Sequence, residues 1–253
     1  MAAVPDNTDN ITQLGDIKAR LKASYDVIAP AYNGWTIPNS AQRLEYLDKL
    51  LALLPQLATK TDTDNKDPNN NSSDVGAAAD AVKILELGCG CGVPITQKLL
   101  GLGTNVQVLA DDISSTQIQL AKEALLADAS ASGRIQFYEG DMASLDIAPA
   151  SLDAVLGLYS IFHLPRAEQP YMLAKIAAWL KPGGYFLGNF AGEDAEAVVF
   201  DKWLHDDGWM FYSGWGEQGT LDMVRKAGFE VVVGEVREDV VKAEFLWVIA
   251  RKL

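Results

Sequence analysis

From Val82 onward, short apolar runs alternate with segments in which apolar residues recur at helical spacing. VKILEL, VQVLA, RIQFYEG, LDAVLGLY and GYFLGNF read as strands, and PITQKLLGLG, STQIQLAKEALLADA and AEQPYMLAKIAAWL read as helices between them. Parallel strands need a long crossover, usually a helix, so this alternation predicts a parallel sheet with helices on both faces. The last two runs, FEVVVGEV and EFLWVIARK, follow the helical pattern TLDMVRKAG and have only a short connection. They are predicted to form an antiparallel pair at the sheet edge.

The segments before this alternation differ in composition from it. A helical pattern starts near residue 15, and Pro30 is expected to break it because proline removes a backbone donor. Ser40 could cap a second helix that ends before Pro55. The domains that we expect are a disordered N-terminus at 1–14, a helical cover at 15–57, a flexible low-complexity linker at 58–80, and a core at 81–253 with an aromatic lid insertion at 191–216.

Charge and composition narrow the possible partners and the location. The net charge of −13, from 34 acidic and 21 basic residues, disfavours nucleic acid because a negative field repels phosphate. No apolar run is long enough to suggest a membrane span, and the N-terminus does not resemble a secretory signal. The two cysteines, Cys89 and Cys91, are separated by one residue, which suits neither a disulfide framework nor a zinc site. We therefore predict a cytoplasmic protein with reduced thiols and no membrane partner, and the sequence does not indicate an oligomeric state.

The first strand of the core runs directly into a glycine-rich loop, Gly88-Cys89-Gly90-Cys91-Gly92. Glycines at alternate positions let the backbone turn sharply and approach a ligand closely. The dinucleotide fingerprint requires a third glycine where Val93 stands, and the phosphate-binding loop requires Gly-Lys-Ser/Thr, which is absent. Glu86 precedes the loop and would repel an anionic pyrophosphate. The loop therefore fits a cofactor that carries positive charge and no phosphate.

From about Lys18 to Leu253 the chain resembles the class I S-adenosylmethionine (SAM)-dependent methyltransferases, particularly the small-molecule branch with an ELGCG-type motif. The resemblance rests on that motif, on the acid at the end of the second strand, on Gly140-Asp141-Met142, and on the turn Lys181-Pro182-Gly183-Gly184. It implies a Rossmann-like α/β fold: a seven-stranded, mostly parallel sheet with an antiparallel C-terminal edge strand and helices on both faces. It also implies SAM as cofactor, S-adenosylhomocysteine (SAH) as product, and no metal.

The resemblance further implies which positions bind the cofactor. Asp112 would accept hydrogen bonds from both ribose hydroxyls, although Asp111 is a neighbouring acid. Asp141 would accept from the adenine amine while Met142 packs against the ring, and Ile113 would flank it. Two tyrosines of the helical cover are expected to close the pocket. The cofactor-binding residues that we predict are Tyr25, Tyr32, Glu86, Gly88, Cys89, Gly90, Gly92, Asp112, Ile113, Gln117, Asp141, Met142 and Leu158.

The stretch after the fourth strand and the aromatic insertion are where the methyl acceptor would bind. His163 is a candidate general base, and a packing role for it is an equal alternative. The aromatic residues could line an apolar substrate pocket or form a small separate core under a long loop. Cys89 and Cys91 are expected to be small loop residues rather than nucleophiles. The substrate-binding residues that we predict are Tyr159, Trp203, Trp209, Phe211 and Trp215.

These observations together predict a methyltransferase that modifies an O, N, S or C atom of a small, apolar or aromatic molecule. One alternative keeps the fold and SAM but assigns a non-methylating reaction or a role as a binding partner. A second alternative, a nicotinamide-dependent oxidoreductase, is disfavoured because the third glycine is missing.

Overall fold

The computed structural model describes residues 16–54, 57, 81–127, 131, 133–240 and 242–253. The segments predicted as a disordered N-terminus and a flexible linker lie outside these residues. Among the described residues, every helix is too short or too polar to span a bilayer.

The helices α1 (Ile17–Thr36) and α2 (Ala41–Leu51) precede the sheet. The Asp16 side chain caps α1 by accepting a hydrogen bond from the backbone N–H of Ala19. The predicted break at Pro30 is wrong, since α1 continues through it to Thr36. Ile28 and Ala29 on one side of Pro30 and Asn33 on the other are buried. Their packing outweighs the cost of roughly 3 kcal/mol that proline imposes inside a helix.

Ser40 occupies the position before α2 but does not cap it with its side chain. Its hydroxyl instead donates to the carbonyl oxygens of Thr36 and Ile37, at 3.0 and 2.6 Å. Ser40 therefore fixes the turn between the two helices.

The sheet confirms the predicted fold class. It has seven strands in the order β3-β2-β1-β4-β5-β9-β8, and the first five strands of that order are parallel. The C-terminal strand β9 is antiparallel to both of its neighbours, so it lies one position inside the edge and β8 is outermost. The strands are β1 (Val82–Leu87), β2 (Val106–Asp112), β3 (Ile135–Glu139), β4 (Leu152–Gly157), β5 (Leu180–Ala191), β8 (Phe229–Glu238) and β9 (Glu244–Lys252).

The predicted turn at 181–184 lies within β5 rather than before it. The pairing of β4 with β5 shifts register there, because Leu152 pairs with Leu180 but Ala154 pairs with Tyr185. Gly183 has a φ of +77°, which allows the extra residues to bulge out of the ladder.

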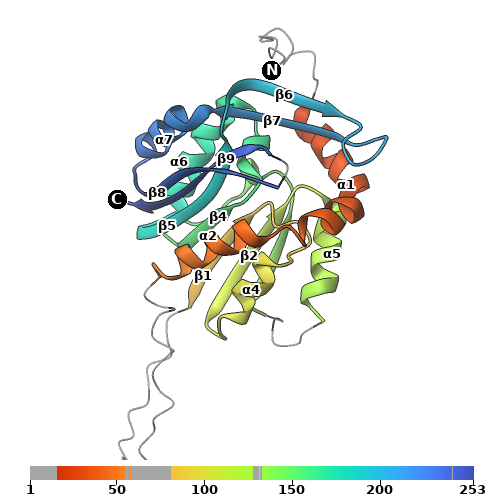
Figure 1. Cartoon of the computed structure of the whole chain (residues 1–253). Helices are drawn as coiled ribbons and strands as arrows, with labels where there is room; N and C mark the ends of the chain where they lie inside the picture. The colour runs from red at the N-terminus through yellow and green to blue at the C-terminus, as the bar shows by residue number, and fades with distance from the viewer. Residues whose placement is uncertain (1–15, 55–56, 58–80, 128–130, 132, 241) are drawn as a thin grey trace, which may run out of the picture.

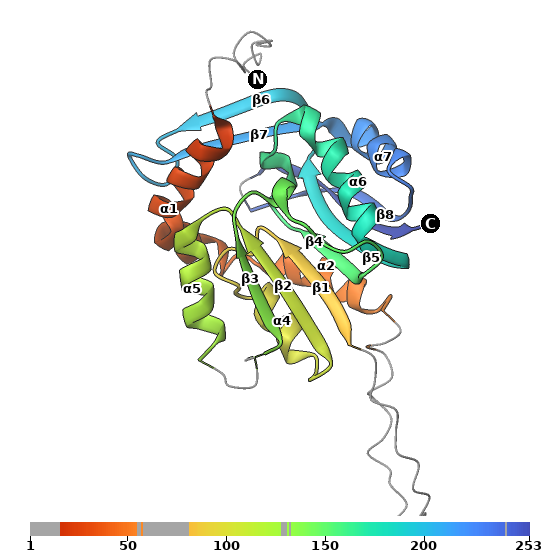
Figure 2. The ribbon, with the colours of Figure 1, turned by 180° about the vertical axis from the view of Figure 1, so that it is seen from behind.

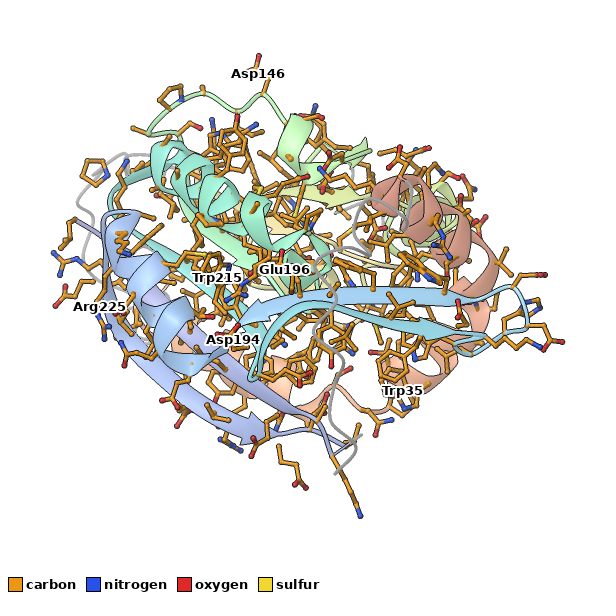
Figure 3. The ribbon with its side chains drawn as sticks, turned by 90° about the horizontal axis from the view of Figure 1, so that it is seen from above. Trp35, Asp146, Asp194, Glu196, Trp215 and Arg225 are labelled. Atoms are coloured by element: carbon orange, nitrogen blue, oxygen red, sulfur yellow. The ribbon has the colours of Figure 1, made fainter. Side chains whose placement is uncertain are left out.

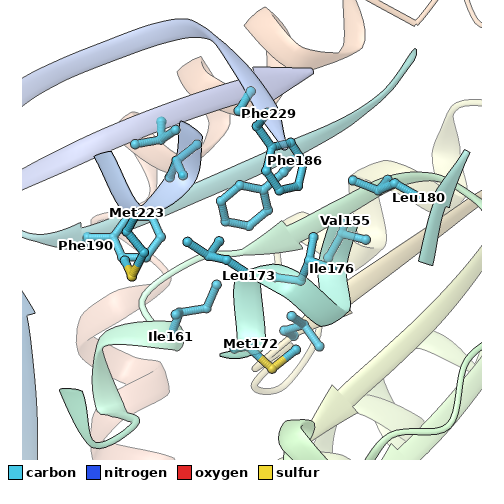
Figure 4. Packing of buried hydrophobic residues seen from close by; sticks show 14 of the residues in the cluster. Val155, Ile161, Met172, Leu173, Ile176, Leu180, Phe186, Phe190, Met223 and Phe229 are labelled. Carbon is cyan, nitrogen blue, oxygen red and sulfur yellow. The ribbon is translucent and has the colours of Figure 1, made fainter. Parts of the chain in front are cut away.

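Helices cover both faces of the sheet, as Figures 1 and 2 show from opposite sides. One face carries α2, α4 and α5, and the other carries α6 and α7. In Figure 4, Leu173 and Ile176 of α6 point toward Val155 and Phe186 of the sheet, and Met172 belongs to the same core. Apolar residues at this spacing give a helix one buried face, which holds it against the strands. These helices are α4 (Ile95–Gly101), α5 (Ser115–Leu125), α6 (Gln169–Trp179) and α7 (Gly216–Lys226).

A two-stranded antiparallel hairpin, β6 (Asp194–Asp201) and β7 (Trp209–Trp215), is separate from the main sheet. Figure 1 shows it across the top of the molecule, with α1 at one end. Ile17 and Leu21 of α1 pack against Trp209 and Phe211 of β7, forming a small core of their own. This contact holds the N-terminal helix against the hairpin.

The strand order reverses between β1 and β4. In open α/β sheets, ligands bind beyond the carboxyl ends of the strands at such a switch point. Three short 3₁₀ helices follow strand ends or lead into α6 at this side of the sheet: η2 (Met142–Ser144), η3 (Ile161–His163) and η4 (Arg166–Glu168).

The contribution of the small core between α1 and β7 to stability can be tested by mutation. Phe211 is fully buried, and Phe211→Ala should lower the free energy of unfolding by about 3–5 kcal/mol because it leaves a cavity. Phe200 of β6 is 46% exposed, so Phe200→Ala should change it by no more than about 0.5 kcal/mol. Urea denaturation of both variants measures the difference, and equal effects would contradict the assignment of this core.

Candidate functional site

A cavity of about 990 Å³, part of it open to solvent, lies at the switch point. Its wall comes from the carboxyl ends of β1, β2 and β4, from η2 and η3, and from α1 and α2. Most residues that the sequence predicted for the site line this cavity. They are Tyr25, Tyr32, Glu86, Gly88, Cys89, Gly90, Asp112, Ile113, Gln117, Asp141, Met142, Leu158, Tyr159 and His163.

The loop after β1 can only be built from glycine at two of its positions. Gly88 has a φ of +72°, and a Cβ there would lie 2.6 Å from the Cβ of Ser160. Gly92 does not line the cavity, contrary to the prediction of a cofactor contact. Its φ is +75° and a Cβ would lie 2.5 Å from Leu125 Cδ1, so Gly92 lets the loop pack on α5 instead.

One end of the cavity combines a buried acid with a cation. Glu86 is 3% exposed and accepts a hydrogen bond of 2.5 Å from the Thr96 hydroxyl, while burial raises its pKa to about 7. Arg43 of α2 lines the same cavity and its charge opposes this rise in the pKa of Glu86. The Arg43 guanidinium donates to the Thr36 carbonyl and to the Ser40 hydroxyl, at 2.6 and 2.7 Å.

The sequence did not lead us to predict Arg43 as a site residue, although its position in α2 indicates such a role. It lies three, four and seven residues before Tyr46, Leu47 and Leu50, which are the buried residues of α2. A charged residue in register with the buried face of a helix needs a local partner or a ligand, and that register is visible in the sequence.

Three acids border the other end of the cavity. Asp112 accepts from the backbone N–H groups of Gly90 and Ser114, at 2.8 and 2.9 Å, and burial raises its pKa to about 6. Asp141 accepts from the Ala143 N–H through Oδ1 and from the Lys18 ammonium through Oδ2. Asp111 is 1% exposed, and neither of its carboxyl oxygens has a hydrogen-bond partner. Burial raises the pKa of Asp111 to about 8, and the charges of Asp112 and Asp141 add to this rise.

The helix α1 covers this end of the cavity and is held there by polar contacts. Lys18 forms ion pairs with Asp141 and Glu168, at 2.7 and 2.5 Å. The amides of Asn33 and Gln117 exchange two hydrogen bonds, at 3.0 and 3.2 Å, between α1 and α5. Any ligand in the cavity would therefore lie beneath α1.

His163 connects the hairpin to α1. Its Nδ1 lies 2.5 Å from the Phe211 carbonyl oxygen of β7, and its Nε2 lies 3.0 Å from the Tyr25 hydroxyl. A carbonyl only accepts, so Nδ1 carries the proton and Nε2 accepts from Tyr25. Burial lowers the pKa of His163 to about 4, so the ring is neutral at physiological pH.

Only one of the four predicted tryptophan and phenylalanine substrate contacts lies next to the cavity wall. The Trp203 ring packs edge-on against Tyr25, at 6.0 Å between centroids, and lies 5.8 Å from the ring of Tyr32. Trp203 therefore contacts two residues that line the cavity without lining it itself. Trp209 and Phe211 do not line the cavity, because alternation along β7 turns both toward α1.

Trp215 is also placed outside the cavity, contrary to the prediction. It lies at the end of the hairpin beside Asp194 and Glu196, as Figure 3 shows. The Arg166 guanidinium sits 4.1 Å from the centroid of a Trp215 ring, and the indole N–H donates to the Arg166 carbonyl. Much of the aromatic segment is therefore packing between layers, the alternative that the sequence had left open.

The strand order, the glycine loop and the cavity at the switch point together define the Rossmann-like fold of the class I methyltransferases. Residues 84–184 match the family model described as a methyltransferase domain. Residues 84–184 are therefore a methyltransferase domain, and this segment carries the glycine loop and the strand-end acids of the cavity. No curated protein sequence matches the chain significantly.

Solved structures share this fold at low sequence identity. The DhpI–SAH complex is 18% identical, with a TM-score of 0.63 over 93% of this chain and 97% of that one. A Burkholderia thailandensis 1,6-didemethyltoxoflavin-N1-methyltransferase, with its substrate and SAH bound, is 19% identical, with a TM-score of 0.61 over 100% and 92%. A SAM-dependent methyltransferase from Methanosarcina mazei is 21% identical, with a TM-score of 0.59 over 70% and 94%.

The unpartnered Asp111 carboxyl predicts how stability depends on pH. Its pKa is raised to about 8 in the folded chain, so the folded state holds a proton that the unfolded state releases above the ordinary pKa near 4. Stability should therefore fall as pH rises from about 4 to 8, by up to about 1.4 kcal/mol per pH unit for this group.

The variant Asp111→Asn removes that titration. Its free energy of unfolding should match the wild type near pH 4.5 and exceed it increasingly toward pH 9, as measured by urea denaturation across the range. Asp146→Asn, in an exposed loop, is the matched control and should follow the wild type throughout. A constant difference between Asp111→Asn and wild type would contradict the raised pKa.

Proposed function

We propose that the chain transfers the methyl group of SAM to an O, N, S or C atom of a small molecule, and that the described cavity holds the cofactor. The observation that carries the proposal is the match between the two ends of the cavity and the two ends of SAM. Glu86 and Arg43 stand at one end, and the acids of β2 and η2 stand at the other.

The donors and acceptors of the cavity fit the charged amino-acid part of SAM. Glu86 would accept from the ammonium group, which would return the buried carboxyl to its ionised form. Arg43 would donate to the carboxylate through N–H groups other than those of Nη2, which bond Thr36 and Ser40. Gly88 lets the loop line the cavity beside Ser160, since a Cβ at this position would lie 2.6 Å from the Cβ of Ser160.

The other end fits an adenosine group. Asp112 is held in place by Gly90 and Ser114, and its carboxylate would accept from the ribose hydroxyls. Asp141 would accept from the adenine amine, with Met142 against the ring. Lys18 forms an ion pair of 2.7 Å with Asp141, and a carboxylate in such a pair acts as an acceptor.

The cofactor, when bound, supplies an electrophilic methyl group on a sulfonium, so the protein mainly orients the reactants and excludes water. Tyr25 and Tyr32 bring aromatic rings to the cavity wall, 5.4 Å apart between centroids. Aromatic faces stabilise cations, and these rings would favour the sulfonium over bulk water. Tyr159 lines the wall near Arg43, and we assign these aromatic residues and Trp203 to the side where the acceptor binds.

Structural relatives support a small-molecule acceptor without identifying it. The Burkholderia relative carries 1,6-didemethyltoxoflavin with SAH. We propose a small, apolar or aromatic substrate rather than a nucleic acid, in keeping with the net charge of −13. A cytoplasmic location is proposed from the two free thiols, Cys89 and Cys91.

Two structural relatives bear on alternative functions for this chain. The [4+2]-cyclase SpnF shares the fold at 20% identity, with a TM-score of 0.54, which favours testing for a non-methylating reaction. A Haloferax volcanii methyltransferase of similar fold is complexed with the activator Trm112, at 16% identity and a TM-score of 0.58. An assay in which methylated product and SAH accumulate together from the isolated chain supports our proposal, whereas product without SAH supports the non-methylating alternative.

For His163 we propose a positioning role. Its Nε2 lone pair is occupied by the Tyr25 hydroxyl, so it holds that ring in the cavity wall. Transfer of a substrate proton to Nε2 would require this hydrogen bond to break first. Variants of Arg43 and His163 test the cofactor site and this positioning role.

The first prediction concerns Arg43. Arg43→Met should weaken SAH binding by about 10- to 100-fold in calorimetry, because a charge-assisted hydrogen bond to the carboxylate contributes about 1.5–3 kcal/mol. Arg225→Met, on the exposed surface of α7, is the matched control and should bind like the wild type. Unchanged affinity in Arg43→Met would refute the role of this residue. Absence of SAM or SAH binding to the wild type would refute the proposed function.

The second prediction concerns His163, which can be observed alone. The chain has two histidines, so His205→Gln leaves a single imidazole signal in the NMR spectrum. That signal should titrate with a midpoint near 4, since burial lowers the pKa of His163 to about 4. Adding Tyr25→Phe removes a hydrogen bond to the neutral ring and should raise the midpoint. A midpoint near 6.5 before that second change would be incompatible with the buried, Tyr25-bonded ring.

A further inference from the structure

The Asp111 carboxyl is the one buried acid among the described residues whose oxygens both lack a partner. Other buried acids are satisfied: Glu86 accepts from Thr96, Asp112 accepts from two backbone N–H groups, and Asp153 pairs with Lys181. Asp111 lines the cavity, and its backbone pairs with β1 on one side and β3 on the other. A buried polar group without a partner costs free energy, so its retention calls for a ligand that supplies one.

The surroundings of Asp111 favour its neutral form. Asp112 on its own strand and Asp141 after β3 are both acids, and Cys89 after β1 is a buried thiol whose pKa is raised. Lys18, which lines the cavity, pairs with Asp141 and Glu168, and Lys22 of the same helix pairs with Asp26. Tyr138 is the residue in register on β3. The described residues contain no group of three ligands that could hold a metal ion.

The neutral form changes what the carboxyl can do. An ionised carboxylate only accepts, whereas a protonated one also donates through its O–H. Asp112 and Asp141 would serve the ribose hydroxyls and the adenine amine as acceptors. The ring nitrogens of adenine need donors, and the Gln117 amide at this end of the cavity already bonds Asn33. A protonated Asp111 carboxyl would be such a donor.

We propose that Asp111 is a recognition residue for the adenine of the cofactor and donates the O–H of its neutral carboxyl to a ring nitrogen of the base. This inference rests on the proposed function, because it assumes that the adenosine end of SAM lies at the β2 end of the cavity. It assigns to Asp111 a role separate from the ribose contact of Asp112, and it explains why two successive acids end the same strand.

Calorimetric titration with SAH tests the proposal. At pH 6.5, Asp111→Asn should bind within about threefold of the wild type, because its amide also donates and accepts. Asp111→Leu should bind about tenfold or more weakly, the loss expected for one buried hydrogen bond. Because the pKa of Asp111 is raised to about 8, wild-type affinity should decline as pH rises above 8, and Asp111→Asn should show no such decline. The exposed-loop variant Asp146→Asn should keep the wild-type pH dependence.

Analogues of SAH that lack one ring nitrogen identify the bond itself. The 1-deaza, 3-deaza and 7-deaza analogues replace N1, N3 or N7 by C–H. One of the three should bind the wild type about tenfold more weakly than SAH does, and Asp111→Leu should not distinguish that analogue from SAH. Circular dichroism and thermal melting establish that both variants fold.

The outcomes distinguish failure of the proposed function from failure of the role assigned to Asp111. If the wild type does not bind SAH at pH 6.5, the proposed function fails and the inference fails with it. If the wild type binds SAH but Asp111→Leu binds equally well, or all three analogues bind the wild type like SAH, the inference alone is overturned. Loss of binding in Asp111→Asn equal to that in Asp111→Leu would also overturn it, because the neutral donor would then not suffice.

Discussion

The burial of carboxyl groups at the ends of β1 and β2 is the constraint on which the rest of the site depends. Glu86, Asp111 and Asp112 are almost completely buried, and in each case burial raises the pKa. Such groups make folding less favourable, because charge or an unpaired polar atom is taken out of water. A ligand with an ammonium group, hydroxyls and ring nitrogens offsets that cost when it binds. The unfavourable burial of these carboxyl groups is thus matched to the cofactor that the fold implies.

The sequence predicted the sheet well because the central strands β1 and β4 are almost entirely buried. Runs such as VKILEL and LDAVLGLY are mostly apolar, and the helices between them show clear helical spacing. The strand-end acids followed from the same pattern, since the carboxyl ends of parallel strands meet at one edge. Pro30 was misread because tertiary packing of α1 overrides local preference, which a local pattern does not reveal.

The predicted substrate contacts show a different limit. Aromatic content alone does not distinguish a ligand pocket from packing between layers, and the alternation of β7 was not recognised within a segment expected to be a lid. Trp209 and Phe211 therefore turned out to face α1 rather than the cavity. Arg43 was missed for a related reason: its proposed role depends on α2 and β1 bringing Arg43 and Glu86 to the same cavity, and thirty residues of sequence separate these two elements. Contacts between distant segments are the part of the site that one sequence does not disclose.

The imidazole of His163 adds a polar link between α1 and β7, two elements that also share a small apolar core. One nitrogen is bonded to the backbone of β7 and the other to a side chain of α1. Departure of α1 would leave Nε2 without its donor, and displacement of β7 would leave the N–H at Nδ1 without its acceptor. Movement of either element alone would therefore cost a buried hydrogen bond. Entry and release of a cofactor beneath α1 would then favour movement of the helix and the hairpin together.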